Sequence, residues 1–189
     1  MRRSEILGLR WRNVDLENNT FDVTEQLPFK VPPKTKVIEE MAPPKSNGRK
    51  LPITELARPF FLKQLAMQEV QKEQAAKDGK PYYDNDLVVA KPDGSPISAS
   101  WVSSQFGKLL EDLDMPHIRF HDLRHSCASL LLANGVPMKM IQEWLGHSDF
   151  STTANIYSHL DYASKVSSAE AMLNGLGMGS NPENAPKKV

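Results

Sequence analysis

In the second half of the chain, apolar residues fall at the spacing of amphipathic helices. Val102, Phe106 and Leu109, for example, can share one side of a helix. Pro137 fits a first helical turn, where the missing backbone N–H costs no hydrogen bond. The predicted helices span residues 98–113, 120–134, 137–145, 151–158 and 161–174.

The first half of the chain mixes helical and extended patterns. Residues 4–11 are predicted to form a helix with apolar positions toward its end. Thr54 is predicted to cap a long amphipathic helix that Gly79 ends. Residues 14–16 and 20–23 flank a pair of asparagines, which indicates a strand entered through a turn.

Further extended segments are predicted from short apolar runs. Residues 37–38 are expected to pair with residues 51–53 across the turn at 46–48. Residues 87–90 are predicted to form a short buried strand. Residues 28–44 hold five prolines, so that segment is expected to be irregular or to lie at a sheet edge.

These patterns predict an α+β fold, a mostly helical domain with a small antiparallel sheet near the N-terminus. Residues 1–174 are expected to form this domain. Residues 175–189 are rich in Gly, Asn and Pro, and we expect them to be a disordered tail.

Composition narrows the class of protein. The chain has 189 residues, 40% of them hydrophobic and 24% charged, as in ordinary globular domains. The single Cys127 excludes a disulfide framework and a cysteine-rich zinc site. No run of eighteen apolar residues occurs and the start lacks a signal peptide, so a cytoplasmic location without membrane contact is expected. A formal net charge of zero argues against a generic basic nucleic-acid binder.

The chemistry-bearing residues gather near the C-terminal end. All five histidines fall between residues 117 and 159. His121 and Arg124 share a face at a helix start, and His125 can join them or turn inward. Gly146 is expected to end its helix and swing His147 out of helical geometry. Cationic donors, an imidazole and a phenol are the groups that phosphoryl transfer needs without a metal.

Each of these residues also has an ordinary structural interpretation. His121 and Arg124 can be the polar first turn of a helix, and His147 can cap a helix end. Tyr157, taken alone, is typical of a packing residue. Only the combination of these residues favours a catalytic role.

The combination resembles the carboxy-terminal signature of the tyrosine recombinase family, the integrases of phages and conjugative elements. The signature consists of His-x-Leu-Arg-His at 121–125, Leu-Gly-His at 145–147 and Tyr157. In the family's first motif, a small residue and an acid follow an arginine two and three residues further on. Residues 2–5 match this motif. Arg2 aligns with the family's catalytic arginine, while the neighbouring Arg3 is the alternative assignment.

The family also uses a lysine on a β-hairpin turn. Residues 45–52 resemble that hairpin, with Lys45 entering the turn. Lys34 and Lys36 are alternatives of similar type that lie further from the predicted strand.

The resemblance implies site-specific DNA recombination, the integration or excision of a mobile element. Tyr157 would attack a phosphodiester to give a 3′-phosphotyrosyl link and a free 5′-hydroxyl. Arg2 and Arg124 would hold the non-bridging oxygens, because guanidinium groups can bridge two oxygens. Lys45 would protonate the leaving 5′-oxygen. His121 would assist proton removal from the phenol, and His147 would donate a hydrogen bond to the phosphate. No metal or cofactor is implied.

The implied partners are double-stranded DNA attachment sites, a homotetramer assembled on them, and accessory DNA-bending or excisionase proteins. The helix at 161–174 is expected to dock on a neighbouring protomer or, equally, on its own domain. Family catalytic domains begin some tens of residues before the first arginine, whereas here Met1 directly precedes Arg2. The chain is therefore expected to be an N-terminally truncated, carboxy-terminal piece of an integrase, or a gene model started at an internal methionine.

Two other functions compete with an active recombinase. One is a truncated, catalytically inactive DNA-binding remnant. The other is an unrelated metal enzyme built on the histidines. The second is disfavoured because Asp122, not a glutamate, follows His121, so the helix lacks a metallohydrolase pattern.

Overall fold

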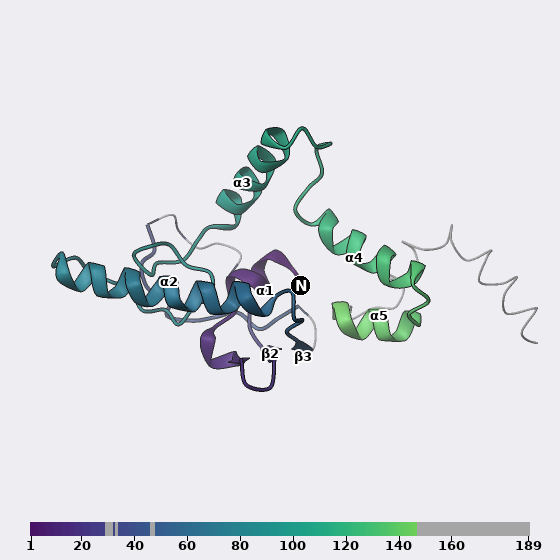
Figure 1. Ribbon diagram of the computed structural model, residues 1–189, viewed down its shortest axis with the longest axis horizontal. Helices are drawn as coiled ribbons and strands as arrows, with labels where there is room; N and C mark the ends of the chain where they lie inside the picture. The colour runs from purple at the N-terminus through teal and green to yellow at the C-terminus, as the bar shows by residue number, and fades with distance from the viewer. Residues whose placement is uncertain (29–31, 33, 46–47, 147–189) are drawn as a thin grey trace, which may run out of the picture. The chain divides into compact units, whose positions relative to one another are not determined.

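The computed structural model of the protein is described over residues 1–146, except for 29–31, 33 and 46–47. These residues lie in one compact unit, Met1–Ser148. Figure 1 labels its helices and most of its strands. In chain order the elements are α1 (Arg3–Leu7), a 3₁₀ turn η1 (Trp11–Asn13), β1 (Val14–Asp15), β2 (Thr20–Val23), β3 (Arg49–Pro52), α2 (Arg58–Lys77), α3 (Ala99–Asp112), α4 (Asp122–Ala133) and α5 (Met138–Leu145).

The sheet has three antiparallel strands in the order β1-β2-β3, which confirms the predicted small sheet. Phe21 of β2 lies opposite Val14 on one side and Leu51 on the other. The predicted partner of the third strand was wrong. Ile38 does not enter the ladder; its backbone N–H donates to the side-chain oxygen of Asn85 at 2.8 Å. Prolines around this segment remove backbone donors, whereas β2 offers an unbroken run of them.

The predicted strand at residues 87–90 was also wrong. The segment makes only isolated bridges, Arg10 with Leu87 and Ala90 with Pro96. The amide nitrogen of Gln68 donates to the carbonyls of Leu87 and Val88 at 3.0 and 3.2 Å. A side chain from α2 therefore satisfies backbone acceptors that a neighbouring strand would otherwise use.

Two helices are shorter than their patterns predicted. α1 ends at Leu7 instead of residue 11, because the backbone beyond it bonds elsewhere: the carbonyl of Leu9 accepts from the N–H of Val88, and the N–H of Trp11 donates to the carbonyl of Asp86. α2 begins at Arg58 instead of Thr54. The Thr54 hydroxyl accepts from the N–H of Ala57 at 3.3 Å, so Thr54 closes the turn before the helix.

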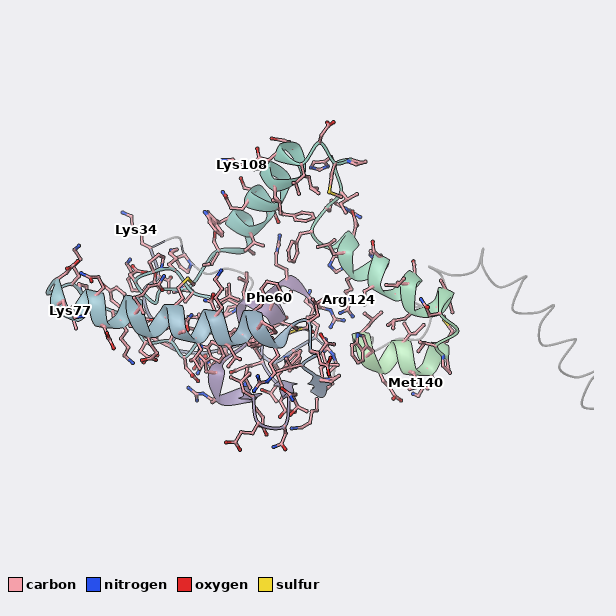
Figure 2. The ribbon with its side chains drawn as sticks, viewed as in Figure 1. Lys34, Phe60, Lys77, Lys108, Arg124 and Met140 are labelled. Atoms are coloured by element: carbon pink, nitrogen blue, oxygen red, sulfur yellow. The ribbon has the colours of Figure 1, made fainter. Side chains whose placement is uncertain are left out.

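The core lies between the sheet and α2. Leu9, Phe21, Val23, Leu51, Ile53 and Val88 form its buried cluster. Phe61 of α2 reaches the cluster, with its ring centroid 6.3 Å from that of Trp11 and 6.1 Å from that of Phe21. The expected apolar stripe of α2 is only partly buried, since Phe60 (Figure 2) and Val70 remain exposed.

The remaining helices follow the predicted pattern. α3, α4 and α5 begin and end within two residues of their predicted bounds. α4 and α5 lie side by side (Figure 1). No helix in the described part of the chain is long and apolar enough to cross a membrane. The helices predicted at 151–158 and 161–174 and the tail at 175–189 fall outside the described residues.

Candidate active site

Arg2 is held between two elements. It precedes α1, and its backbone N–H donates to Glu5 Oε2 at 2.7 Å. Its side chain donates through Nη1 to Glu5 Oε1 at 2.9 Å and through Nη2 to the carbonyl of Gly146 at 3.1 Å. The guanidinium is therefore fixed between α1 and the end of α5.

Glu5 is a buried carboxylate with two arginine partners. Its side chain has no exposed surface. Arg2 precedes it in the chain, while Arg49 follows it and donates to its Oε2 at 2.8 Å. Burial by itself raises the pKa of Glu5. Hydrogen bonds from the Arg49 side chain and the Arg2 backbone outweigh burial and bring that pKa down to about 2. Glu5 is therefore charged at neutral pH and holds both guanidinium groups.

Arg124 is a buried cation with an open donor. It lies in the first turn of α4 (Figure 2) and is 6% exposed. Its Nη2 donates to the carbonyl of Leu145, while Nη1 is buried without a partner among the described residues. Burial and the nearby charge of Arg2 lower the pKa of Arg124 to about 10, so it remains charged at neutral pH. A buried cationic donor without a partner is suited to an anionic ligand.

The C-terminal end of α5 brings the three arginines together. The carbonyls of residues 144, 145 and 146 accept from Arg49, Arg124 and Arg2 in that order. The last carbonyls of a helix have no partner within the helix, and the helix dipole favours cations there. Gly146 ends the helix in the left-handed conformation, at φ 68° and ψ 53°, as predicted. The chain continues from this point into His147.

Two cavities adjoin these residues. One, of about 180 Å³, is lined by Arg124, His121 and Cys127. The other, of about 770 Å³, is lined by Arg2, Lys45 and His121. His121 lines both, so four of the predicted site residues border two neighbouring cavities.

His121 is placed to accept a proton. It precedes α4, and its ring meets the ring of His125 edge to face, with centroids 5.2 Å apart. Partial burial lowers the pKa of His121 below its usual value of 6.5, and the neighbouring His125 and Arg124 lower it further. The imidazole is therefore mainly neutral at pH 7.

The predicted residues and their alternatives have different surroundings. Lys36 pairs with Asp93 at 2.6 Å and lies 5.2 Å from the ring centroid of Tyr83, whereas Lys45 lines the larger cavity. Arg3 donates to the hydroxyl of Ser103 on α3 and lines both cavities, whereas Arg2 reaches the end of α5 and lines the larger one.

Two predicted residues, His147 and Tyr157, lie outside the described part of the chain. Within the described part, no group of three His, Cys, Asp or Glu side chains could hold a metal ion.

Sequence reasoning missed Arg49 and treated Glu5 only as part of a motif. A signal for Arg49 was present. Alternate residues of a strand share a face, and Leu51 of β3 is buried, so Arg49 had to point inward as well. An inward arginine needs a carboxylate partner, and Glu5 is that partner.

The chain is similar to known proteins. Residues 1–164 match the model of the Phage integrase family. The tyrosine recombinase XerC-like protein of Caldanaerobacter subterraneus subsp. tengcongensis is 32% identical over 182 residues, which are 91% of this chain and 46% of that protein. The integrase of Staphylococcus phage L54a is 25% identical over 168 residues, 85% of this chain and 44% of that protein. The chain thus spans about half the length of these relatives.

Solved structures agree on the fold. The Tn1549 transposon integrase in complex with transposon right end DNA matches with a TM-score of 0.71 at 24% identity, over 91% of this chain and 54% of that chain. XerA recombinase matches with a TM-score of 0.59 at 21% identity, over 92% of this chain and 52% of that chain.

Proposed function

Because the chain belongs to the Phage integrase family, we propose that it is the catalytic part of a site-specific tyrosine recombinase. It cleaves and rejoins double-stranded DNA at the attachment sites of a mobile element. The Tn1549 integrase was solved with transposon DNA, which supports duplex DNA as the partner of this chain. A homotetramer on DNA, with accessory DNA-bending or excisionase proteins, is part of the proposal. So is the assignment of residues 1–174 to the catalytic domain and of residues 175–189 to a tail.

One observation carries the proposal. Arg124 is 6% exposed and keeps a buried Nη1 without a partner among the described residues, beside a cavity that His121 also lines. Arg2 approaches the same helix end, one carbonyl further along the chain. Two adjacent guanidinium groups suit the two non-bridging oxygens of a phosphodiester, whose charge grows in the transition state.

The reaction then runs as a transesterification. The Tyr157 oxygen attacks phosphorus and the bond from phosphorus to the 5′-oxygen breaks, which leaves a 3′-phosphotyrosyl link. Neutral His121 accepts the phenolic proton, and Lys45 gives a proton to the departing 5′-oxygen. Arg2 and Arg124 hold the non-bridging oxygens, and His147 donates to the phosphate. The bond energy stays in the link, so rejoining needs no nucleotide cofactor.

The covalent link is the decisive test. Nicked duplexes tiled across the DNA that flanks the coding sequence would be incubated with the chain and denatured. Release of the short fragment after cleavage traps the adduct. We expect a denaturation-resistant protein–DNA adduct that peptide mapping places on Tyr157. Tyr157→Phe should abolish the adduct and keep DNA binding, because only the attacking oxygen is lost.

Tyr162, five residues further on, is the matched control, and Tyr162→Phe should still form the adduct. An adduct that survives Tyr157→Phe would overturn the proposal. Binding to these duplexes without any adduct would favour the inactive DNA-binding remnant.

A further inference from the structure

Arg49 is buried close to the proposed phosphate site without lining it. Its side chain is 9% exposed, and it is absent from the described residues that line the two cavities. Its Nη2 donates to Glu5 Oε2 at 2.8 Å, and its Nε donates to the carbonyl of Trp144 at 3.1 Å. A group in this position acts on the site through Glu5 and the end of α5.

We propose that Arg49 is a positioning residue for strand cleavage, which offsets the charge of Glu5 and so keeps Arg2 available to the scissile phosphate. This inference rests on the proposed function. The reason is electrostatic. A buried carboxylate next to Arg2 would cancel its charge and repel a phosphate, and at this depth that effect is weakly screened.

The two arginines share the carboxylate. Arg49 donates to Oε2 through Nη2 at 2.8 Å and more weakly to Oε1 through Nη1 at 3.4 Å. Arg2 donates to Oε1 through its guanidinium Nη1 and to Oε2 through its backbone N–H. Arg2 keeps Nη2 on the carbonyl of Gly146. With Arg49 present, two guanidinium charges face one carboxylate, so the group keeps a net positive charge. Without Arg49, Glu5 and Arg2 form a neutral pair.

The second contact of Arg49 fixes geometry. Its Nε joins β3 to the carbonyl of Trp144, one residue before the carbonyl that holds Arg124. The forked guanidinium makes both contacts at once. A lysine in its place has a single nitrogen and can keep the charge but not both contacts. Charge and geometry can therefore be separated by substitution.

The test compares single-turnover cleavage by wild type, Arg49→Met, Arg49→Lys and Glu5→Gln/Arg49→Met. Arg49→Met should slow cleavage roughly 100-fold and Arg49→Lys roughly ten-fold, as for loss of charged hydrogen bonds. DNA affinity should change less than about three-fold, since phosphate contacts elsewhere dominate it. The double variant should recover part of the rate, because it removes the charge that Arg49 offsets.

A second substrate separates charge from folding. A methylphosphonate replaces one non-bridging oxygen by a methyl group and so removes the negative charge of the scissile phosphate. The defect of Arg49→Met should shrink on this substrate, whereas a misfolded variant would be equally slow on both. Lys50 is the next residue of β3, with a side chain 60% exposed and paired with Asp22, and Lys50→Met should cleave at the wild-type rate.

Binding of inorganic phosphate, followed by NMR titration, gives a readout without cleavage. Phosphate should bind wild type more tightly than Arg49→Met, and the double variant should recover part of that affinity. The role of Arg49 is overturned if wild type cleaves and Arg49→Met cleaves equally fast. It is also overturned if Arg49→Met is equally slow on the phosphodiester and the methylphosphonate. Either result leaves the proposed function standing. If wild type also fails to cleave, the proposed function fails. The phosphate titration then still decides the role of Arg49. Equal phosphate binding by wild type and Arg49→Met, or no binding by wild type, would overturn that role.

Discussion

At the scale of single residues, surroundings decide what a lysine can do. Lys36 is engaged by Asp93, and this hydrogen bond raises the pKa of the lysine and makes it a poorer acid. Lys45 is exposed and borders the cavity that Arg2 and His121 also line. A proton donor must reach the leaving oxygen, so Lys45 is the better placed of the two.

Lys45→Ala should slow cleavage of an ordinary phosphodiester by roughly 10²- to 10⁴-fold, the usual contribution of a general acid. It should scarcely affect a substrate in which sulfur replaces the leaving 5′-oxygen, because a thiolate leaves without a proton. Single-turnover rates on both substrates measure this. Lys36→Ala is the matched control and should cleave both at wild-type rates. Equal damage by Lys45→Ala on both substrates would move the role to Lys36 or another group.

The sequence predicted a candidate site from residues that carry a motif, but it did not predict the residues that contact them. The resemblance to a family's motifs proposed Arg2, Lys45, His121 and Arg124, and in the structure these four residues line two adjoining cavities. Arg49 has no motif of its own. Its role depends on Glu5, which lies 44 residues away in the chain, and only folding brings the two together.

At the scale of elements, local sequence patterns predicted which segments are helical better than they predicted where each helix ends. α5 ended at Leu145 as predicted, because Gly146 gives a local signal, and α4 ended within one residue of its prediction, just before Gly135 with its positive φ. α1 stopped early because the backbone of residues 9–11 bonds to residues 86–88, a distant segment. The same limit explains β3, whose partner is β2 and not the nearer residues 37–38. Short extended segments pair according to packing, which local sequence does not contain.

Gly8, just after α1, lies close to the backbone of a distant segment. An alanine Cβ there would lie 2.4 Å from the backbone nitrogen of Leu27, so the backbone must move. Gly8→Ala should lower the free energy of unfolding by about 1–3 kcal/mol, as overpacking does. Urea denaturation would measure it.

Gly107, inside α3, is the matched control because a Cβ there meets nothing within 4 Å. Gly107→Ala should raise the free energy of unfolding by about 0.5–1 kcal/mol, since alanine is the better helix former. Equal effects of the two substitutions would contradict the close backbone packing at Gly8.

At the scale of the whole Met1–Ser148 unit, the Glu5 network joins segments that are far apart in sequence. Arg2 and Glu5 belong to the start of the chain, Arg49 to β3, and the accepting carbonyls to the end of α5. Since Glu5 has no exposed surface, its charge has no water to replace a lost partner. The network should therefore affect the stability of the unit as well as the chemistry of the site.

Acid should weaken the unit through Glu5. Its pKa is about 2 in the folded protein against 4.5 for an unperturbed glutamate. Because the folded value is depressed, the carboxylate contributes stability that is fully present above about pH 4.5 and is lost as the pH falls through about 2. The difference between the two pKa values corresponds to roughly 3 kcal/mol at neutral pH. Glu5→Gln should lose at least that much at pH 7, since it leaves two arginines without their counter-charge.

Urea denaturation of wild type and Glu5→Gln from pH 7 to pH 2 measures this loss. The difference in the free energy of unfolding between the two proteins should shrink as the pH falls from 4.5 toward 2, because a protonated glutamate resembles a glutamine. Glu73→Gln, at a side chain that is 70% exposed on α2, is the control and should follow wild type throughout. A difference between wild type and Glu5→Gln that stays constant over this range would mean that the carboxylate does not stabilise the fold through its charge. The two arginines would then have to be held by the carbonyls at the end of α5 alone.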